Sequence, residues 1–304
     1  MTVRLWGVRG SLPCPGPQTV RYGGNTISLE LRYEPNQKLI IVDAGSGIRS
    51  LGNYIMKNDL PKGPIKAKIF FSHTHWDHIL GFPFFIPIFL PTTELQIYGP
   101  KTFEDDSLQN VVGGQLQYRY FPVNSGELAA KISWNHLGET HMDLGDGLSV
   151  KTKYLNHPIL CLGYRFNQNG KNIVTIFDHE PFRNLFPTDP SHPDYDPVLA
   201  KEGEEEATRQ NRLVERFMEN ADVVIHDAQY TTKEYLAGKV GWGHTPMETA
   251  INTAGRAGVK KLVLIHHDPE RTDDQLDEME ALYQKMLHGK TTMEVVFARE
   301  GMVL

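Results

Sequence analysis

The chain has 304 residues, 37 of them acidic and 31 basic, and its formal net charge at pH 7 is −6. This acidic balance argues against a general nucleic-acid binder, which normally presents a basic face, so we do not expect nucleic acid as a partner. Two cysteines are too few for a disulfide-stabilised scaffold, and the first residues lack the apolar core of a signal peptide, so we expect a cytoplasmic protein.

The spacing of apolar residues predicts that strands and helices alternate along the whole chain. Strands are expected near residues 3–8, 26–32, 38–43, 67–71, 94–98, 131–136, 148–155, 160–166, 172–177, 222–226, 261–265 and 293–298. Helices are expected near residues 47–57, 103–110, 204–219, 246–257 and 273–288. This mixture predicts an α+β fold with a mixed sheet covered by helices. Segments 100–130 and 180–203 look like irregular insertions, which serve either as lids and interfaces or as solvated decoration.

Four potential metal ligands follow the predicted strand near 67–71. They are His73, His75, Asp77 and His78, within the run Ser-His-Thr-His-Trp-Asp-His. An extended pair at i and i+2 can direct His73 and His75 to one ion, and Asp77 and His78, past a bend, can face a second ion. Imidazoles together with a carboxylate suit zinc or a similar divalent metal. The cluster therefore predicts two bound metals.

The His-x-His-x-Asp-His spacing resembles the motif of the metallo-β-lactamase superfamily. The resemblance runs through most of the chain and implies an αββα sandwich, two mixed β-sheets flanked by helices, formed by residues 1–304 as one domain. It also implies that Asp43, in the loop Asp-Ala-Gly-Ser-Gly, orients the metal-binding loop. A phosphate-binding role for that loop is less favoured, since it lacks the glycine spacing and the Lys-Ser/Thr ending such loops need.

By the same resemblance, the remaining ligands are sought at the ends of three later strands. His157, Asp178 and His266 follow the strands near 148–155, 172–177 and 261–265. The resemblance implies one metal bound by His73, His75 and His157, another bound by Asp77, His78 and His266, and Asp178 bridging the two.

Three points about this ligand set stay open. His267 is the alternative to His266, because the strand period of two directs only one of them toward the site. His266 is favoured since the family's last ligand directly follows its strand. His157 alone could also be a loop histidine. The metal is expected to be zinc, with manganese or iron as alternatives, and coordination positions left for water indicate a catalytic site.

Further motifs resemble the phosphodiesterase branch of the superfamily, which includes ribonuclease Z and cyclic-phosphate hydrolases. They are Gly-Val-Arg-Gly-Ser-Leu-Pro at 7–13, Tyr-Gly-Gly-Asn-Thr at 22–26 and His-Asp-Ala-Gln at 226–229. In ribonuclease Z the acid of the last motif pairs with a downstream histidine, which implies a pair between Asp227 and His244 here. Aspartate in place of the family's glutamate keeps the charge and shortens the reach.

The residues after His244 suggest a phosphate site on their own account. Thr245-Pro246-Met247-Glu248 has the form of a capping box with proline at the first helical position, which would put His244 just before a positively polarised helix start. A protonated His244 can stabilise a phosphate or protonate the leaving oxygen. The alternative is a histidine that serves only the loop and the cap.

These features predict a dinuclear metal-dependent phosphodiesterase that hydrolyses a small cyclic phosphodiester, with a cyclic nucleotide as the first candidate. Asp77, His244 and Asp227 are its predicted catalytic residues. Asn25, Trp76 and Trp242 are expected to contact substrate, since tryptophan rings can stack on a base. The acidic charge, together with no basic Gly/Pro-rich arm of the kind ribonuclease Z uses on transfer RNA, argues against a large RNA substrate.

Alternatives are an RNA 3′-end processing endonuclease, an ester or lactone hydrolase of the same fold, and a metal-binding sensor without turnover. The resemblance further implies a homodimer. We expect no association with membranes, because the most apolar stretch, residues 82–90, is too short to span a bilayer and contains two prolines.

Overall fold

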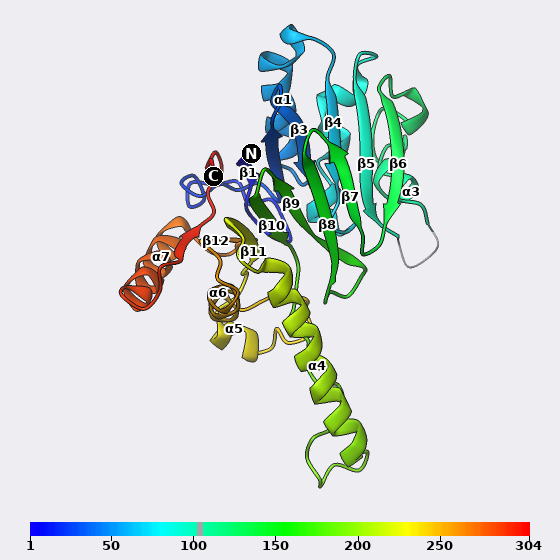
Figure 1. The fold of residues 1–304 in the computed structure, drawn as a ribbon. Helices are drawn as coiled ribbons and strands as arrows, with labels where there is room; N and C mark the ends of the chain where they lie inside the picture. The colour runs from blue at the N-terminus through cyan, green and yellow to red at the C-terminus, as the bar shows by residue number, and fades with distance from the viewer. Residues whose placement is uncertain (102–105) are drawn as a thin grey trace.

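Two mixed β-sheets pack face to face in the computed structural model, which describes residues 1–101 and 106–304, and helices cover their outer faces (Figure 1). The first sheet contains β1 (Thr2–Gly7), β2 (Ser28–Tyr33), β3 (Lys38–Val42), β4 (Lys66–Phe70), β5 (Glu94–Pro100) and β6 (Lys131–Leu137), in that order. The second sheet runs in reverse order from β13 (Glu294–Phe297) through β12 (Lys261–Ile265), β11 (Val223–Asp227), β10 (Lys171–Ile176), β9 (Cys161–Gln168) and β8 (Leu148–Leu155) to β7 (His141–Gly145). The predicted α+β sandwich is confirmed.

The α-helices of the described residues range from four to 22 residues in length. They are α1 (Ile48–Asn58), α2 (Trp76–Ile79), α3 (Leu108–Gly113), α4 (Pro197–Met218), α5 (Thr232–Leu236), α6 (Met247–Arg256) and α7 (Asp273–Leu287). Within the described residues, no helix combines the length and apolar character needed to span a bilayer.

Side-chain alternation along the strands explains why two sheets and an outer helical layer form together. In β3, Ile40 and Val42 point into the core between the sheets, while Leu39 and Ile41 pack under α1. β12 divides in the same way, with alternate residues facing the other sheet and the helices behind. A strand that is apolar on both faces is stable only when both faces are covered, which these sequences therefore specify.

The direction of the strands decides where polar residues gather. β3, β4, β5 and β6 are parallel, and so are β10, β11, β12 and β13. Because parallel strands end at the same edge of a sheet, the residues that follow β4, β10 and β12 meet at one end of the sandwich. The candidate ligands are among these residues.

Each predicted strand overlaps an observed one, but several details differ from prediction. The prediction omits β7, α2 and α5. The helix predicted near 103–110 begins instead at Leu108, where the Ser107 side chain accepts a hydrogen bond from the Asn110 amide, and residues 102–105 lie outside the described residues.

The segment 180–203, predicted to be irregular, is partly helical. α4 begins at Pro197, and the carboxylate of Asp196 caps it by accepting from the amides of Val198 and Leu199. Pro197 is the first residue of the helix, where its missing N–H has no cost. The loop before α4 and the first half of that helix, residues 184–208, project from the body of the molecule (Figure 1). We call this segment the acidic arm.

Candidate metal centre

The chain after β4 has the shape that two adjacent metal sites require. His75 is extended, with φ −63° and ψ 152°, and the short helix α2 begins at the next residue. The extended stretch directs His73 and His75 one way, and the helical turn directs Asp77 and His78 another, as the spacing predicted. Asp178 and His266, at the ends of β10 and β12, have left-handed backbone conformations with φ of 49° and 68°. Such strain in residues other than glycine is concentrated at functional sites.

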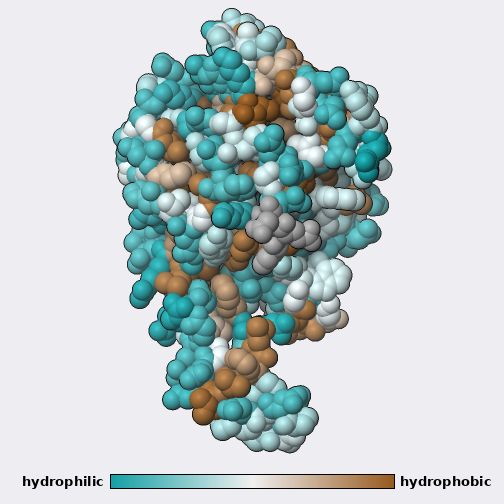
Figure 2. Space-filling view, turned by 90° about the vertical axis from the view of Figure 1, so that its right-hand side faces the viewer, coloured by the Kyte–Doolittle hydropathy of each residue, from teal (hydrophilic) through white to brown (hydrophobic). Residues whose placement is uncertain are grey.

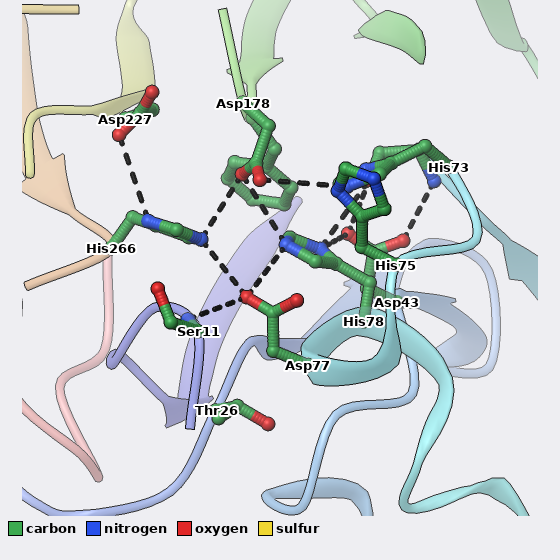
Figure 3. Close-up of polar contacts among 12 residues, drawn as sticks. Ser11, Thr26, Asp43, His73, His75, Asp77, His78, Asp178, Asp227 and His266 are labelled. Carbon is green, nitrogen blue, oxygen red and sulfur yellow. Dashed lines mark hydrogen bonds and ion pairs between the residues drawn. The ribbon is translucent and has the colours of Figure 1, made fainter. Parts of the chain in front are cut away.

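The seven predicted ligands lie in two groups that share Asp178, and Figure 3 labels all of them except His157. In each group, one ligand atom from every residue lies within 4.8 Å of the others: His73, His75, His157 and Asp178 in the first group, and Asp77, His78, Asp178 and His266 in the second.

The two oxygens of Asp178 divide between the groups. Oδ2 lies 3.4 Å from His73 Nε2 and 3.8 Å from His157 Nε2. Oδ1 lies 3.3 Å from His78 Nε2 and 3.2 Å from His266 Nε2. This is the placement required of a carboxylate that bridges two ions.

The residues present fit two divalent cations. His73 Nε2, His78 Nε2 and Asp178 Oδ1 are buried and have no hydrogen-bond partner, which costs roughly 1–3 kcal/mol for each group left unsatisfied. A cation in the first group would satisfy His73, and one in the second group would satisfy His78 and Asp178 Oδ1. Burial also lowers the pKa of His157 to about 4 and that of His73 well below its usual value, so both imidazoles are neutral and can act as metal ligands.

Hydrogen bonds orient the candidate ligands from outside. Asp43 Oδ2 lies 2.8 Å from His78 Nδ1, and the Ser72 amide and hydroxyl donate to the two oxygens of Asp43, each at 2.7 Å. The amide of Ser11 donates to Asp77 Oδ2 at 2.7 Å. Such partners fix the ring orientation and raise the affinity of a ligand for metal. Asp43 thus lies where the resemblance implies. Ser11 lies in the motif at 7–13, but the sequence assigned it no role, because it acts through its backbone amide.

Asp227 and His244 form the pair expected from the resemblance. His244 Nδ1 lies 3.1 Å from Asp227 Oδ2, and the amide of Thr245 donates to the same oxygen. The His244 ring stacks on the ring of His266 with centroids 4.8 Å apart. The other oxygen of Asp227, Oδ1, lies 3.7 Å from His266 Nδ1, which is too far for a hydrogen bond. One carboxylate therefore faces both the candidate proton donor and a candidate ligand.

The charge around His244 favours its protonated form. Burial lowers its pKa, but the carboxylates of Asp227, Asp178 and Asp77 outweigh burial and raise the pKa to about 9. Bound divalent cations would oppose this rise, since they add positive charge beside the ring.

The capping box predicted at Thr245 does not form. The N-cap of α6 is Pro246 and carries no side-chain cap, while the Thr245 hydroxyl donates to the carbonyl of His179. Glu248 accepts instead from the amide and hydroxyl of Thr232, both at 2.8 Å. Tertiary hydrogen bonds have replaced the local ones. Thr245 and Pro246 separate His244 from the first helical residue, Met247. The start of α6 therefore gives less support to a phosphate site at His244 than the sequence predicted.

The residues expected to contact substrate are placed differently from one another. Trp76 and Trp242 are 81% and 55% exposed; Trp76 follows His75 directly, and Trp242 precedes His244 by two residues. The side chain of Asn25 is engaged elsewhere: it accepts from the Ser46 hydroxyl at 2.9 Å and donates to Glu300 at 3.1 Å. Because these contacts occupy Asn25 in holding the N-terminal loop, we leave it out of the proposed substrate site.

Of the two adjacent histidines, the structure brings His266 to the ligand groups. His267 is buried on the opposite side, with Nε2 donating to the carbonyl of Ala298 at 2.9 Å. Burial lowers the pKa of His267 to about 3, although the hydrogen bond to Ala298 raises it. This histidine is therefore neutral in the folded protein.

Acidification is expected to destabilise the metal-free protein through His267. An unfolded histidine titrates near pH 6.5, so between that pH and about 3 the unfolded chain binds a proton that the folded chain does not. The contribution is fully present above pH 6.5 and is lost as the pH falls, by about 1.4 kcal/mol per pH unit. In urea unfolding with chelator present, His267→Gln should reduce this slope, whereas His136→Gln, at an exposed position, should not. Equal slopes for wild type and His267→Gln would contradict the assignment.

No family model matches the chain. Among curated proteins, ribonuclease Z of Lactococcus lactis subsp. lactis is 31% identical over 234 residues, which cover 66% of this chain and 70% of that protein. Ribonuclease Z of Streptococcus pneumoniae is 28% identical over 277 residues, covering 80% and 82% of the two chains.

Solved structures share the fold over the whole chain. The metallo-β-lactamase fold protein YhfI from Bacillus subtilis has a TM-score of 0.62 at 18% identity, and covers 100% of this chain and 98% of its own. The short form of human tRNase Z has a TM-score of 0.60 at 19% identity, with the same coverage. The sequence relatives and the shared fold confirm the resemblance. The chain is a metal-dependent hydrolase that belongs to the metallo-β-lactamase superfamily, in the phosphodiesterase branch that contains ribonuclease Z.

Proposed function

We propose that the chain is a dinuclear phosphodiesterase acting on a small phosphodiester, with a cyclic nucleotide as the first candidate. The observation that carries the proposal is the stacking of His244, paired with Asp227, on His266 of the second ligand group. A proton donor therefore lies beside the place where a metal-bound phosphate would sit. A hydrolase that cleaves P–O bonds needs such a donor for a poor leaving group.

The residues divide the chemistry between them. Two cations held by the seven ligands would supply Lewis-acid stabilisation of phosphate charge and an activated water. His244 would protonate the departing oxygen, while Asp227 holds its Nδ1 and favours the charged form. Asp77, fixed by the Ser11 amide, would also orient the attacking water. Zinc suits this histidine-rich set, with manganese or iron as alternatives.

The acidic arm supports a small substrate. Between residues 184 and 208 it carries seven carboxylates and one lysine. Figure 2 shows it as a lobe below the body, with hydrophobic and hydrophilic residues intermixed. The chain enters the arm six residues after Asp178. A protein that grips an RNA backbone needs cations on such an extension, and carboxylates there repel phosphate.

Exposed aromatic rings near the centre support a nucleotide. Lys239 Nζ lies 3.8 Å from the ring centroid of Trp242, which precedes His244 by two residues. An exposed indole can stack on a base, and the lysine next to it adds positive charge for a phosphate. Trp76, which lies between His75 and Asp77 in the chain, offers a second exposed indole.

The second candidate function is RNA 3′-end processing. It is favoured by the ribonuclease Z relatives and by the fold shared with human tRNase Z. A homodimer remains an expectation from the resemblance, and a cytoplasmic location remains one from the cysteine content.

A substrate panel distinguishes the two candidates. Zinc-loaded protein should hydrolyse bis(p-nitrophenyl) phosphate and cyclic nucleotides, cleave precursor tRNA more slowly, and leave a β-lactam intact. Replacing Glu204, Glu205 and Glu206 of the arm by lysine should speed cleavage of precursor tRNA, through charge, without changing hydrolysis of cyclic nucleotides. If wild type prefers precursor tRNA, the small-substrate proposal is wrong. Efficient β-lactam turnover without phosphodiester hydrolysis would overturn the reaction class.

A further inference from the structure

A buried carboxylate, Glu180, contacts the loop that carries His244. We propose that Glu180 is a positioning residue that sets both the orientation of the metal ligand His157 and the place of His244. It lies two residues after Asp178 and is only 4% exposed. The part of this inference that concerns His244 rests on the proposed function; the part that concerns His157 requires only that the first ligand group binds metal.

Both oxygens of Glu180 are occupied by donors from one segment. Oε1 accepts from the Tyr235 hydroxyl at 2.5 Å and from the Gly241 amide at 2.8 Å, and Oε2 accepts from the Gly243 amide at 2.8 Å. Two alternate backbone N–H groups thus converge on one carboxylate, an arrangement that recognises anions strongly. We call residues 241–245 the glycine loop.

The glycines allow this loop its path. Gly241 and Gly243 have φ of 89° and 85°, in the left-handed region that favours glycine. At Gly243 space is also limiting, because a Cβ there would lie 2.2 Å from His157 Nδ1. The loop therefore passes directly against the candidate ligand, and its position decides that of the imidazole.

From the glycine loop, two contacts lead to the centre. The carbonyl of Gly243 accepts from His157 Nδ1 at 3.0 Å, which aims His157 Nε2 at the first ligand group. The next residue is His244, held by Asp227 at 3.1 Å. Thr245 ties the same loop to the carbonyl of His179, next to Glu180. The segment that follows Asp178 thus holds the glycine loop in place. That loop in turn contacts the ligand His157 and carries the proton donor His244.

Glu180→Gln tests this role with little change in shape. The amide keeps one acceptor oxygen but presents N–H donors to a backbone N–H, so the loop must shift. Glu248→Gln is the matched control. Glu248 also accepts from a tyrosine hydroxyl, that of Tyr283 at 2.7 Å, and from a backbone amide, that of Thr232. Neither partner belongs to the glycine loop. Tyr235→Phe removes one of the three donors to Glu180 and serves if Glu180→Gln fails to fold.

Zinc affinity, measured by chelator competition, should fall roughly 10–100-fold in Glu180→Gln, the usual range for losing a partner that orients a ligating histidine. The kcat for a cyclic nucleotide should fall by roughly 10² with little change in KM, because a displaced donor lowers catalysis rather than binding. For bis(p-nitrophenyl) phosphate, whose leaving group needs no proton, the fall should be smaller. Tyr235→Phe should change each quantity in the same direction but less.

Glu248→Gln should lower the melting temperature about as much as Glu180→Gln does. It should change neither the zinc affinity nor the dependence of kcat on the leaving group. Unchanged zinc affinity in Glu180→Gln, or equal effects of Glu180→Gln and Glu248→Gln, would overturn the proposal. If wild type hydrolyses no phosphodiester, the proposed function fails, but the effect on zinc affinity still decides whether Glu180 orients His157.

Discussion

Replacing Asp178 with alanine is expected to remove both metal ions and abolish hydrolysis. Its two oxygens face different ligand groups, at 3.4 Å from His73 Nε2 and 3.2 Å from His266 Nε2. Removing it takes a ligand from each group and leaves the buried imidazoles without their shared carboxylate. Elemental analysis after gel filtration measures the outcome directly.

Two single-group variants are the controls for Asp178→Ala. His157→Ala removes a ligand from the first group only, and Asp77→Ala removes one from the second group only. Each should reduce the metal content by one ion or less. If Asp178→Ala also loses only one ion and binds the other normally, Asp178 does not bridge the two sites.

The second large effect is expected from His244→Ala. Its turnover of a cyclic nucleotide should fall by roughly 10²–10⁴, the range for losing a positioned proton donor, with both ions retained. The loss should shrink for bis(p-nitrophenyl) phosphate, because p-nitrophenolate departs without a proton. Equal losses of turnover on both substrates would show that His244 does not donate a proton to the leaving group.

Asp227 provides a further test of the same pair. Asp227→Ala should lower turnover less than His244→Ala, and the double variant should resemble His244→Ala, since residues acting as a unit show non-additive losses. Multiplicative losses in the double variant would contradict the pair.

Local spacing and strand ends account for what the sequence predicts well. The run from His73 to His78 needs only an extended stretch followed by one helical turn, which the short segment after β4 provides. His157, Asp178 and His266 each lie just past a strand of recognisable length, and parallel strands bring such ends together. Short local segments, each a strand and the few residues after it, are therefore sufficient to predict much of the ligand set.

Features set by tertiary contacts could not be predicted in this way. The Thr245 hydroxyl has a local partner in the capping-box pattern, but it donates to His179, 66 residues earlier. The local sequence around Glu180, a glutamate before a proline, gives no sign of its role, because the two amides that it binds belong to a loop that begins 61 residues later. Asn25 belongs to a motif shared with the branch, yet its contact with Glu300, near the other end of the chain, determines its role.

We propose that two metals held by one shared carboxylate, that of Asp178, carry out phosphodiester hydrolysis. The most direct measurement is a titration of metal-free protein with zinc, following bound metal and hydrolysis of bis(p-nitrophenyl) phosphate in the same samples. Activity should be absent without metal and should reach a plateau at two zinc ions per chain. Hydrolysis by the metal-free protein, or a plateau at one ion per chain, would contradict the claim.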